Sequence, residues 1–209
     1  MGWVSRVAAA ILMALVLARR GQSATISVRV LNRPGIAAAL VAQGEKQAGD
    51  TLHRAAIDVV WVNCATTGTQ ECSRRPNPTS LVLTILKHGD KMTSEDALGL
   101  AVQDETGFGA YFYVFEDKLN EIAGTTHIHP SLLLGDAIAH EIGHLLKGSH
   151  SHSATGIMSG RWSRRELEAA ARSALWFTKE DEAAMNAHLE MRENAGRKIA
   201  SAVPDHARF

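Results

Sequence analysis

The sequence predicts an α+β domain that follows a removable leader. Segments with the residue pattern of β-strands are interspersed with longer segments whose apolar residues recur at helical spacing, and no internal repeat or linker divides them. The 209 residues are 45% hydrophobic and 21% charged, which is typical of a globular protein. The 22 basic and 22 acidic residues cancel, so no bulk charge favours nucleic acid or an anionic membrane as a partner.

The N-terminal residues have the pattern of a secretory signal peptide. Residues 7–18 form an unbroken apolar run, which as a helix spans about 18 Å and is too short for a bilayer core of about 30 Å. We therefore expect residues 1–24 to be removed, leaving a secreted or periplasmic protein without stable membrane insertion. A short uncleaved anchor is the alternative.

Three segments have the composition of β-strands, and two further apolar segments follow them. Residues 25–30 alternate between apolar and polar side chains, and residues 57–62 are rich in β-branched side chains. Residues 81–86 form the apolar run of a buried strand. The later segments are residues 98–102 and the aromatic residues 110–115.

Apolar residues at helical spacing predict four helices. The predicted helices cover residues 36–56, 131–146, 163–175 and 178–194. Ser131 and Thr178 are expected to cap the second and the fourth helix, because a hydroxyl accepts a hydrogen bond from the first free backbone N–H groups. One domain is then expected over residues 25–195, with residues 196–209 as a flexible tail.

Cys64 and Cys72 are the only cysteines, and they flank a short polar segment. In an oxidising compartment they are expected to close a small disulfide loop. Zinc binding by this pair is disfavoured, because the chain has no C-x-x-C spacing and no pair of histidines nearby. Free thiols are the alternative.

An H-E-x-x-H motif at residues 140–144 lies in the second long predicted helix. His140 and His144 are one helical turn apart, about 6 Å at Cβ, so both imidazoles can reach one Zn²⁺ at about 2.0–2.1 Å. Glu141 is rotated off that face and can act on a metal-bound water instead. Two ordinary helix histidines are the alternative interpretation.

A catalytic zinc site takes three protein ligands and leaves one position for water. Gly148 is expected to end the helix, because glycine tolerates the left-handed conformation at a helix C-terminus. His150 and His152 follow it and are the candidate third ligands. Asp136, one turn before His140, is either an acceptor for that imidazole or a solvated acid.

These residues resemble the metzincin clan of zinc metalloproteases, whose pattern is H-E-x-x-H-x-x-G-x-x-H followed by a methionine turn. The two motif histidines, Glu141, His150 and Met158 match that pattern. The H-S pair before I-M is similar to the matrixin branch, and the resemblance covers about residues 25–160. It implies a zincin-like domain with a small twisted mixed sheet, a long backing helix, an active-site helix and C-terminal helices.

The resemblance also implies roles for two segments. Met158 is expected to form an apolar floor beneath the histidines. Residues 98–102 are expected to be the exposed edge strand along which a peptide or protein substrate binds as an added strand.

The sequence departs from the family pattern at the glycine. Lys147 stands at the family position, and Gly148 comes one residue later. One extra helical residue would move the third ligand to His152, whose segment is similar to short secreted bacterial zincin-like proteins that end the site with H-S-x-x-G-I-M. His150 is favoured because it permits a tight reversal after Gly148, and His152 is its rival.

The sequence therefore predicts a secreted zinc endopeptidase with one catalytic Zn²⁺, a zinc-activated water and Glu141 as general base. One alternative is a gluzincin-type hydrolase in which Glu166 or Glu168 supplies the third ligand. The other is a non-catalytic secreted zinc-binding protein, which an intact Glu141 disfavours because a structural site has no use for a general base. Trp162 is expected in the core rather than against substrate. No feature predicts the oligomeric state.

Overall fold

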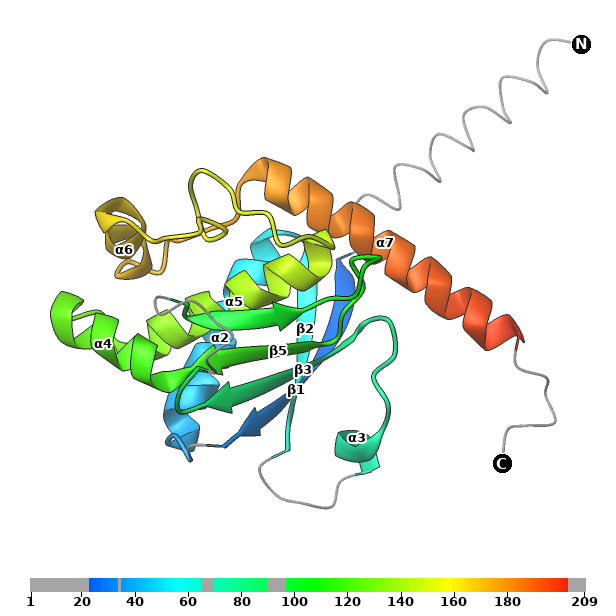
Figure 1. The fold of residues 1–209 in the computed structure, drawn as a ribbon, viewed down its shortest axis with the longest axis horizontal. Coiled ribbons are helices and arrows are strands. Elements are labelled where there is room, and N and C mark those ends of the chain that lie inside the picture. The colour runs from blue at the N-terminus through cyan, green and yellow to red at the C-terminus, as the bar shows by residue number, and fades with distance from the viewer. Residues whose placement is uncertain (1–22, 34, 65–69, 90–96, 203–209) are drawn as a thin grey trace, which may run out of the picture.

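The structure, a computed structural model, describes residues 23–33, 35–64, 70–89 and 97–202. Residues 1–22 of the predicted leader lie outside the described residues. The described chain forms a five-stranded mixed sheet, a long backing helix, a helix that carries the H-E-x-x-H motif, and C-terminal helices (Figure 1). The predicted α+β fold class is confirmed.

The sheet is mostly parallel. Its strands are β1 (Ala24–Asn32), β2 (Ile57–Asn63), β3 (Ser80–Leu86), β4 (Gly99–Val102) and β5 (Tyr111–Phe115). They lie in the order β2-β1-β3-β5-β4, and only β4 is antiparallel to its neighbour β5. All five segments singled out in the sequence are strands, and β4 lies at one edge of the sheet.

The backing helix α2 (Ala38–Arg54) and the motif helix α5 (Pro130–Lys147) pack tightly against each other. Two glycines permit the close approach. A Cβ at Gly44 would lie 2.9 Å from the Leu134 side chain, and a Cβ at Gly135 would lie 2.6 Å from the Gly44 carbonyl oxygen. Both helices contribute to one apolar core with the inner side chains of the sheet.

Helix α5 begins one residue earlier than expected. Pro130 occupies its first turn, and the N-cap is His129, whose Nδ1 accepts a hydrogen bond from the Ser131 N–H. The predicted Ser131 cap is therefore wrong, and Ser131 lies buried inside the first turn. The predicted end is confirmed, because Gly148 adopts φ +64° and its N–H donates to the His144 carbonyl.

Three further helices differ from the expectations. α4 (Glu116–Thr126) was not foreseen, and the short α3 (Gln70–Ser73) lies in the cysteine segment. α6 (Arg164–Ala170) is shorter than the predicted helix over 163–175, since the chain reverses at Ser173 with φ +51°.

The C-terminal helix α7 (Lys179–Ala202) is longer than predicted. Residues 196–202 are helical and not a flexible tail, while residues 203–209 lie outside the described residues. An ion pair one turn apart, between Arg197 and Glu193, and several alanines favour the continuation.

Cys64 and Cys72 form the predicted disulfide, with a Cα–Cα distance of 5.8 Å. A disulfide indicates an oxidising compartment. Among the described residues, no helix has both the length and the apolar character needed to cross a membrane.

Candidate metal centre

Helix α5 brings His140 and His144 together on one face. Their rings meet edge to face with centroids 4.7 Å apart, and their Nε2 atoms are 3.1 Å apart. Two ligands at about 2.0–2.1 Å from a tetrahedral ion lie roughly 3.3 Å from each other. The spacing of the two Nε2 atoms therefore suits a shared Zn²⁺.

Backbone carbonyls fix the orientation of both rings. His140 Nδ1 lies 2.6 Å from the Ile157 carbonyl oxygen, and His144 Nδ1 lies 3.1 Å from that of Ser149. A carbonyl only accepts hydrogen bonds, so each Nδ1 carries the proton and each Nε2 presents its lone pair. This is the arrangement that metal-binding histidines ordinarily have.

His152 is the third member of the cluster. One ring nitrogen from each of His140, His144 and His152 lies within 4.8 Å of the other two. The His152 ring centroid is 4.9 Å from that of His144, whereas the His150 ring is 6.1 Å from it and stays outside the group. The structure thus brings His152 to the other two histidines, whereas the sequence favoured His150 as the third ligand.

The length of α5 explains the difference. The helix continues through Lys147 and reverses only at Gly148, one residue after the family glycine position. The next residue, Ser149, turns its carbonyl toward His144. The chain then reaches the cluster at His152, and matrixin spacing does not describe this site.

Burial keeps the histidines neutral. It lowers the pKa of His140 to about 4 and the pKa of His144 to about 3. Burial, with Lys147 and His150 nearby, also lowers the pKa of His152. Neutral imidazole is the form that binds a metal ion, so the donor set fits Zn²⁺ in chemistry as well as in geometry.

Glu141 lies against the edge strand β4. Its side chain is buried, and the Ala101 N–H donates a hydrogen bond to the carboxylate. The carboxylate approaches the strand because residue 99 is glycine: a Cβ on Gly99 would lie 2.6 Å from Glu141 Oε1. Burial raises the pKa of Glu141 to about 8. A divalent cation at the histidines would favour its ionised form.

Met158 lies fully buried beneath the motif. Its Sδ fills the space where a side chain on Gly143 would begin, between the two helix histidines. A tight turn holds it there, in which the Ser153 N–H donates to the Met158 carbonyl at 2.8 Å and Gly156 adopts φ +78°. The methionine is thus an apolar support for this turn of α5.

A cleft of about 680 Å³ opens at the histidines. Its walls are β4, helix α4, and the segment from Ser159 to α6. Trp162 is half-buried: it packs against the apolar core, as expected, and it also lines the cleft. Its Nε1 donates to the Ile157 carbonyl at 3.1 Å, the same oxygen that accepts from His140.

The α4 wall and Gly99 are the site features that sequence reasoning missed. α4 contributes a mixed apolar and polar set of side chains to the cleft: Lys118, Glu121, Ile122 and Thr125. The glycine at the start of an otherwise apolar strand was the available signal for Gly99, because glycine inside a strand marks a close approach of other atoms.

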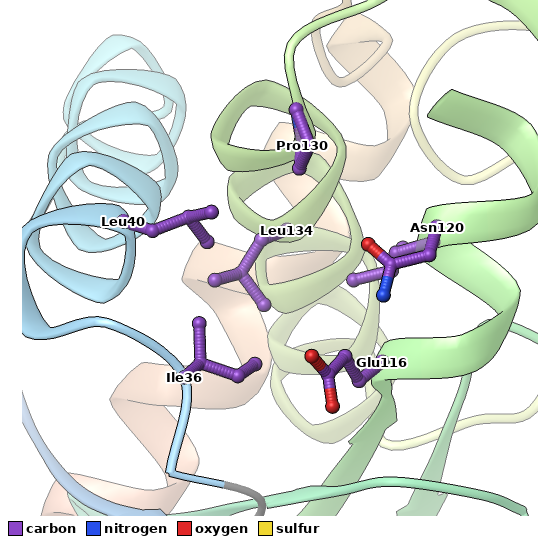
Figure 2. A pocket seen from close by; sticks show the side chains of 7 residues that line it. Ile36, Leu40, Glu116, Asn120, Pro130 and Leu134 are labelled. Carbon is purple, nitrogen blue, oxygen red and sulfur yellow. The ribbon is translucent and has the colours of Figure 1, made fainter. Parts of the chain in front are cut away.

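A second cavity is far smaller. It measures about 30 Å³ and lies between the start of α2, α4 and the N-terminus of α5 (Figure 2). Ile36, Leu40 and Leu134 face it from one side, with Glu116 and Asn120 opposite. This space holds about two water molecules at most and has no part in the metal centre.

Three other candidate residues are engaged elsewhere. The Glu166 carboxylate accepts hydrogen bonds from the backbone and side chain of Ser163 in the capping box of α6. The Glu168 carboxylate accepts from Arg164 Nε at 2.8 Å. Asp136 Oδ1 accepts from Gln47 on α2 at 2.8 Å. The acceptor for His140 Nδ1 is the Ile157 carbonyl instead.

Comparisons with known proteins find solved structures to which this chain is similar in fold. The crystal structure of archaemetzincin from Methanopyrus kandleri is 15% identical to this chain, with a TM-score of 0.49. The match covers 82% of this chain and 98% of that one. No family model matches this chain, and no curated protein matches it.

Proposed function

We propose that this protein is a secreted zinc-dependent endopeptidase of the metzincin type. One observation carries the proposal: the ring nitrogens of His140, His144 and His152 converge beside the buried Glu141 at a large cleft. Three imidazoles with a neighbouring carboxylate and an open side are the donor set of a catalytic zinc site, whereas structural zinc sites have four protein ligands.

Zn²⁺ bound by these imidazoles would polarise the scissile carbonyl and lower the pKa of water at the open position. Glu141 is proposed to accept the proton of the attacking water and to transfer it to the leaving amine. Its carboxylate lies between the ligand face of α5 and strand β4, where the N–H of Ala101 holds it. It can therefore reach both the metal side and a substrate on the strand.

The proposed substrate is an extended peptide that adds to the free edge of β4. β4 is the terminal strand of the sheet and lines the cleft from residue 99 to residue 101. Main-chain hydrogen bonds to such an edge accept many sequences. Apolar groups of Ile122, Trp162 and Leu167 on the facing walls favour a substrate with an apolar side chain near the scissile bond.

Secretion is proposed from two features. The leader pattern of residues 1–24 predicts export, and the Cys64–Cys72 disulfide suits an oxidising compartment. N-terminal sequencing of the exported protein is expected to find a mature chain that starts near Ser23 or Ala24.

The test combines metal analysis with a cleavage assay on the mature chain. We expect one Zn²⁺ per chain and hydrolysis of casein that chelation abolishes and added zinc restores. The matched variant is Glu141→Gln, which keeps the shape and removes the base. It is expected to retain zinc and lose about 10²–10⁴-fold in rate. Zinc binding without hydrolysis of any protein or peptide substrate would instead support a non-catalytic zinc-binding protein.

A further inference from the structure

A buried carboxylate outside the cleft connects the end of α5, the loop that carries His152, and the start of α7. Asp181, in the first turn of α7, is 2% exposed. Its Oδ1 accepts from Lys147 Nζ at the end of α5 and from Ser153 Oγ in the loop, each at 2.7 Å. Its Oδ2 accepts from the backbone and side chain of Thr178.

These contacts reach both neighbours of His152. Lys147 Nζ also lies 3.4 Å from the Ser151 carbonyl oxygen, and Ser153 follows His152 directly. The backbone on each side of the histidine is therefore tied to the same Lys147–Asp181 pair. His152 is an exposed residue, so the position of its ring depends largely on the backbone that carries it.

We propose that Asp181 is a positioning residue that holds His152 at the metal centre through Lys147 and Ser153. The inference rests on the proposed function in taking the three histidines as ligands of one ion. It also assigns a role to Lys147, which stands at the family glycine position. Because helix α5 is one residue longer, the chain reverses one residue later. The side chain of Lys147, the last residue of the helix, then anchors the loop that brings His152 back to the cluster.

The charge state of the pair supports this role. The side chains of Lys147 and Asp181 are 9% and 2% exposed, and a charge that is so shielded from water needs a partner. Burial acts to raise the pKa of Asp181, but hydrogen bonds from Lys147, Ser153 and Thr178 outweigh it and hold that pKa below its usual value. Asp181 is thus ionised at neutral pH and accepts at both oxygens.

The two oxygens allow the positioning role to be separated from a structural one. Oδ1 holds the loop, whereas Oδ2 serves the start of α7, where the Asp181 N–H donates back to Thr178 Oγ1. Ser153→Ala removes the loop contact and leaves the helix start intact. Thr178→Ala removes contacts at the helix start and leaves Lys147 and Ser153 in place.

The experiment measures zinc affinity by competition with a chromophoric chelator, and the visible absorption of the Co²⁺-loaded protein. Asp181→Asn is expected to weaken zinc binding about 10- to 100-fold, and Ser153→Ala about 10-fold. Both variants are expected to change the intensity of the cobalt bands, because a loosened third ligand alters the coordination. Thr178→Ala is expected to lower the melting temperature and to leave zinc affinity and the cobalt spectrum unchanged.

Zinc affinity and cobalt spectra like those of the parent in both Ser153→Ala and Asp181→Asn would overturn the proposal. If Asp181→Asn fails to fold, by circular dichroism, Ser153→Ala alone decides. Unchanged zinc affinity in His152→Ala would also overturn it, since Asp181 would then have no ligand to position. A parent protein that binds zinc through His152 but cleaves no peptide contradicts the endopeptidase and leaves the positioning role supported.

Discussion

At the scale of single residues, the carbonyl oxygen of Ile157 orients two side chains of the candidate metal centre. The Ile157 carbonyl accepts from His140 Nδ1 and from Trp162 Nε1, so it orients a helix histidine and a cleft wall together. Ile157 itself is fully buried beside Met158, and its N–H donates to the Trp176 carbonyl. Packed backbone thus holds the ring of His140 in the orientation that the proposed metal site requires, which limits the rearrangement needed for an ion to bind.

The two loop histidines give the first prediction. His152→Ala is expected to empty the site or to weaken zinc binding by orders of magnitude, because its ring nitrogen belongs to the cluster. His150→Ala is the matched control two residues away, and it is expected to bind zinc like the parent. Competition with a chromophoric chelator measures both. The opposite order of affinities would restore His150 as the ligand.

Asp136 gives a prediction on pH dependence. This side chain is fully buried, and its Oδ2 has no hydrogen-bond partner among the residues that the structure describes. Burial raises its pKa to about 7, against about 3.9 in an unfolded chain. The folded state holds the proton more tightly, so the free energy of unfolding falls as pH rises from about 4 to about 7 and then levels off.

Asp136→Asn removes this titration and keeps an acceptor for Gln47. The variant is expected to be more stable than the parent by about 2–4 kcal/mol at pH 8, and by close to nothing at pH 4. Urea unfolding of the zinc-loaded proteins at several pH values measures the difference. A difference that does not vary with pH would contradict the raised pKa.

At the scale of the elements, the end of α5 depends on partners far away in the chain. The last carbonyls of a helix lack partners within the helix. Here the His144 carbonyl accepts from the Gly148 N–H and from Gln103, and the Leu146 carbonyl accepts from His188 on α7. The turn that carries His144 is therefore fixed by the β4–β5 connection and by α7.

The edge strand gives the third prediction. A Cβ in Gly99→Ala would lie 2.5 Å from the Tyr113 carbonyl oxygen and 2.6 Å from Glu141 Oε1, so strand and carboxylate must both shift. We expect a loss of about 1–3 kcal/mol in stability and a larger fractional loss in hydrolysis than in zinc affinity. The control is Gly124→Ala on α4, where the added Cβ would meet no atom of another described segment within 4 Å. Full hydrolytic activity in Gly99→Ala would show that the position of Glu141 is not critical.

Local patterns predicted the strands, because an alternation or a run of apolar side chains follows directly from burial. They also predicted the motif helix and its end at Gly148. They did not predict α4, which starts straight after β5 at Phe115 without a side-chain cap and ends at His127 in the left-handed conformation. The shifted Gly148 offered His152 only as the rival of His150, because the path of its loop also depends on Asp181, far along the chain. A feature that depends on contacts between distant segments cannot be predicted from the local residue pattern alone.

At the scale of the whole molecule, α7 joins segments that are distant in sequence. Arg192 is almost fully buried and donates to three backbone carbonyls, those of Pro78, Gly109 and Leu145. These lie before β3, before β5 and in the last turn of α5. The guanidinium also lies over the Phe108 ring, 5.6 Å from its centroid. One side chain thus connects the sheet to the helix that carries His140 and His144.

Replacing Arg192 is accordingly expected to destabilise the whole fold. Arg192→Met leaves three carbonyl acceptors without their donor, and we expect a loss of about 2–4 kcal/mol in the free energy of unfolding. Arg192→Lys is the informative companion: it keeps the charge, but one ammonium group cannot reach three separated oxygens, so a loss of similar size is expected. Urea unfolding of the zinc-loaded proteins measures both. Full stability in Arg192→Lys would mean that the buried charge, and not the three-way hydrogen bonding, is what α7 contributes.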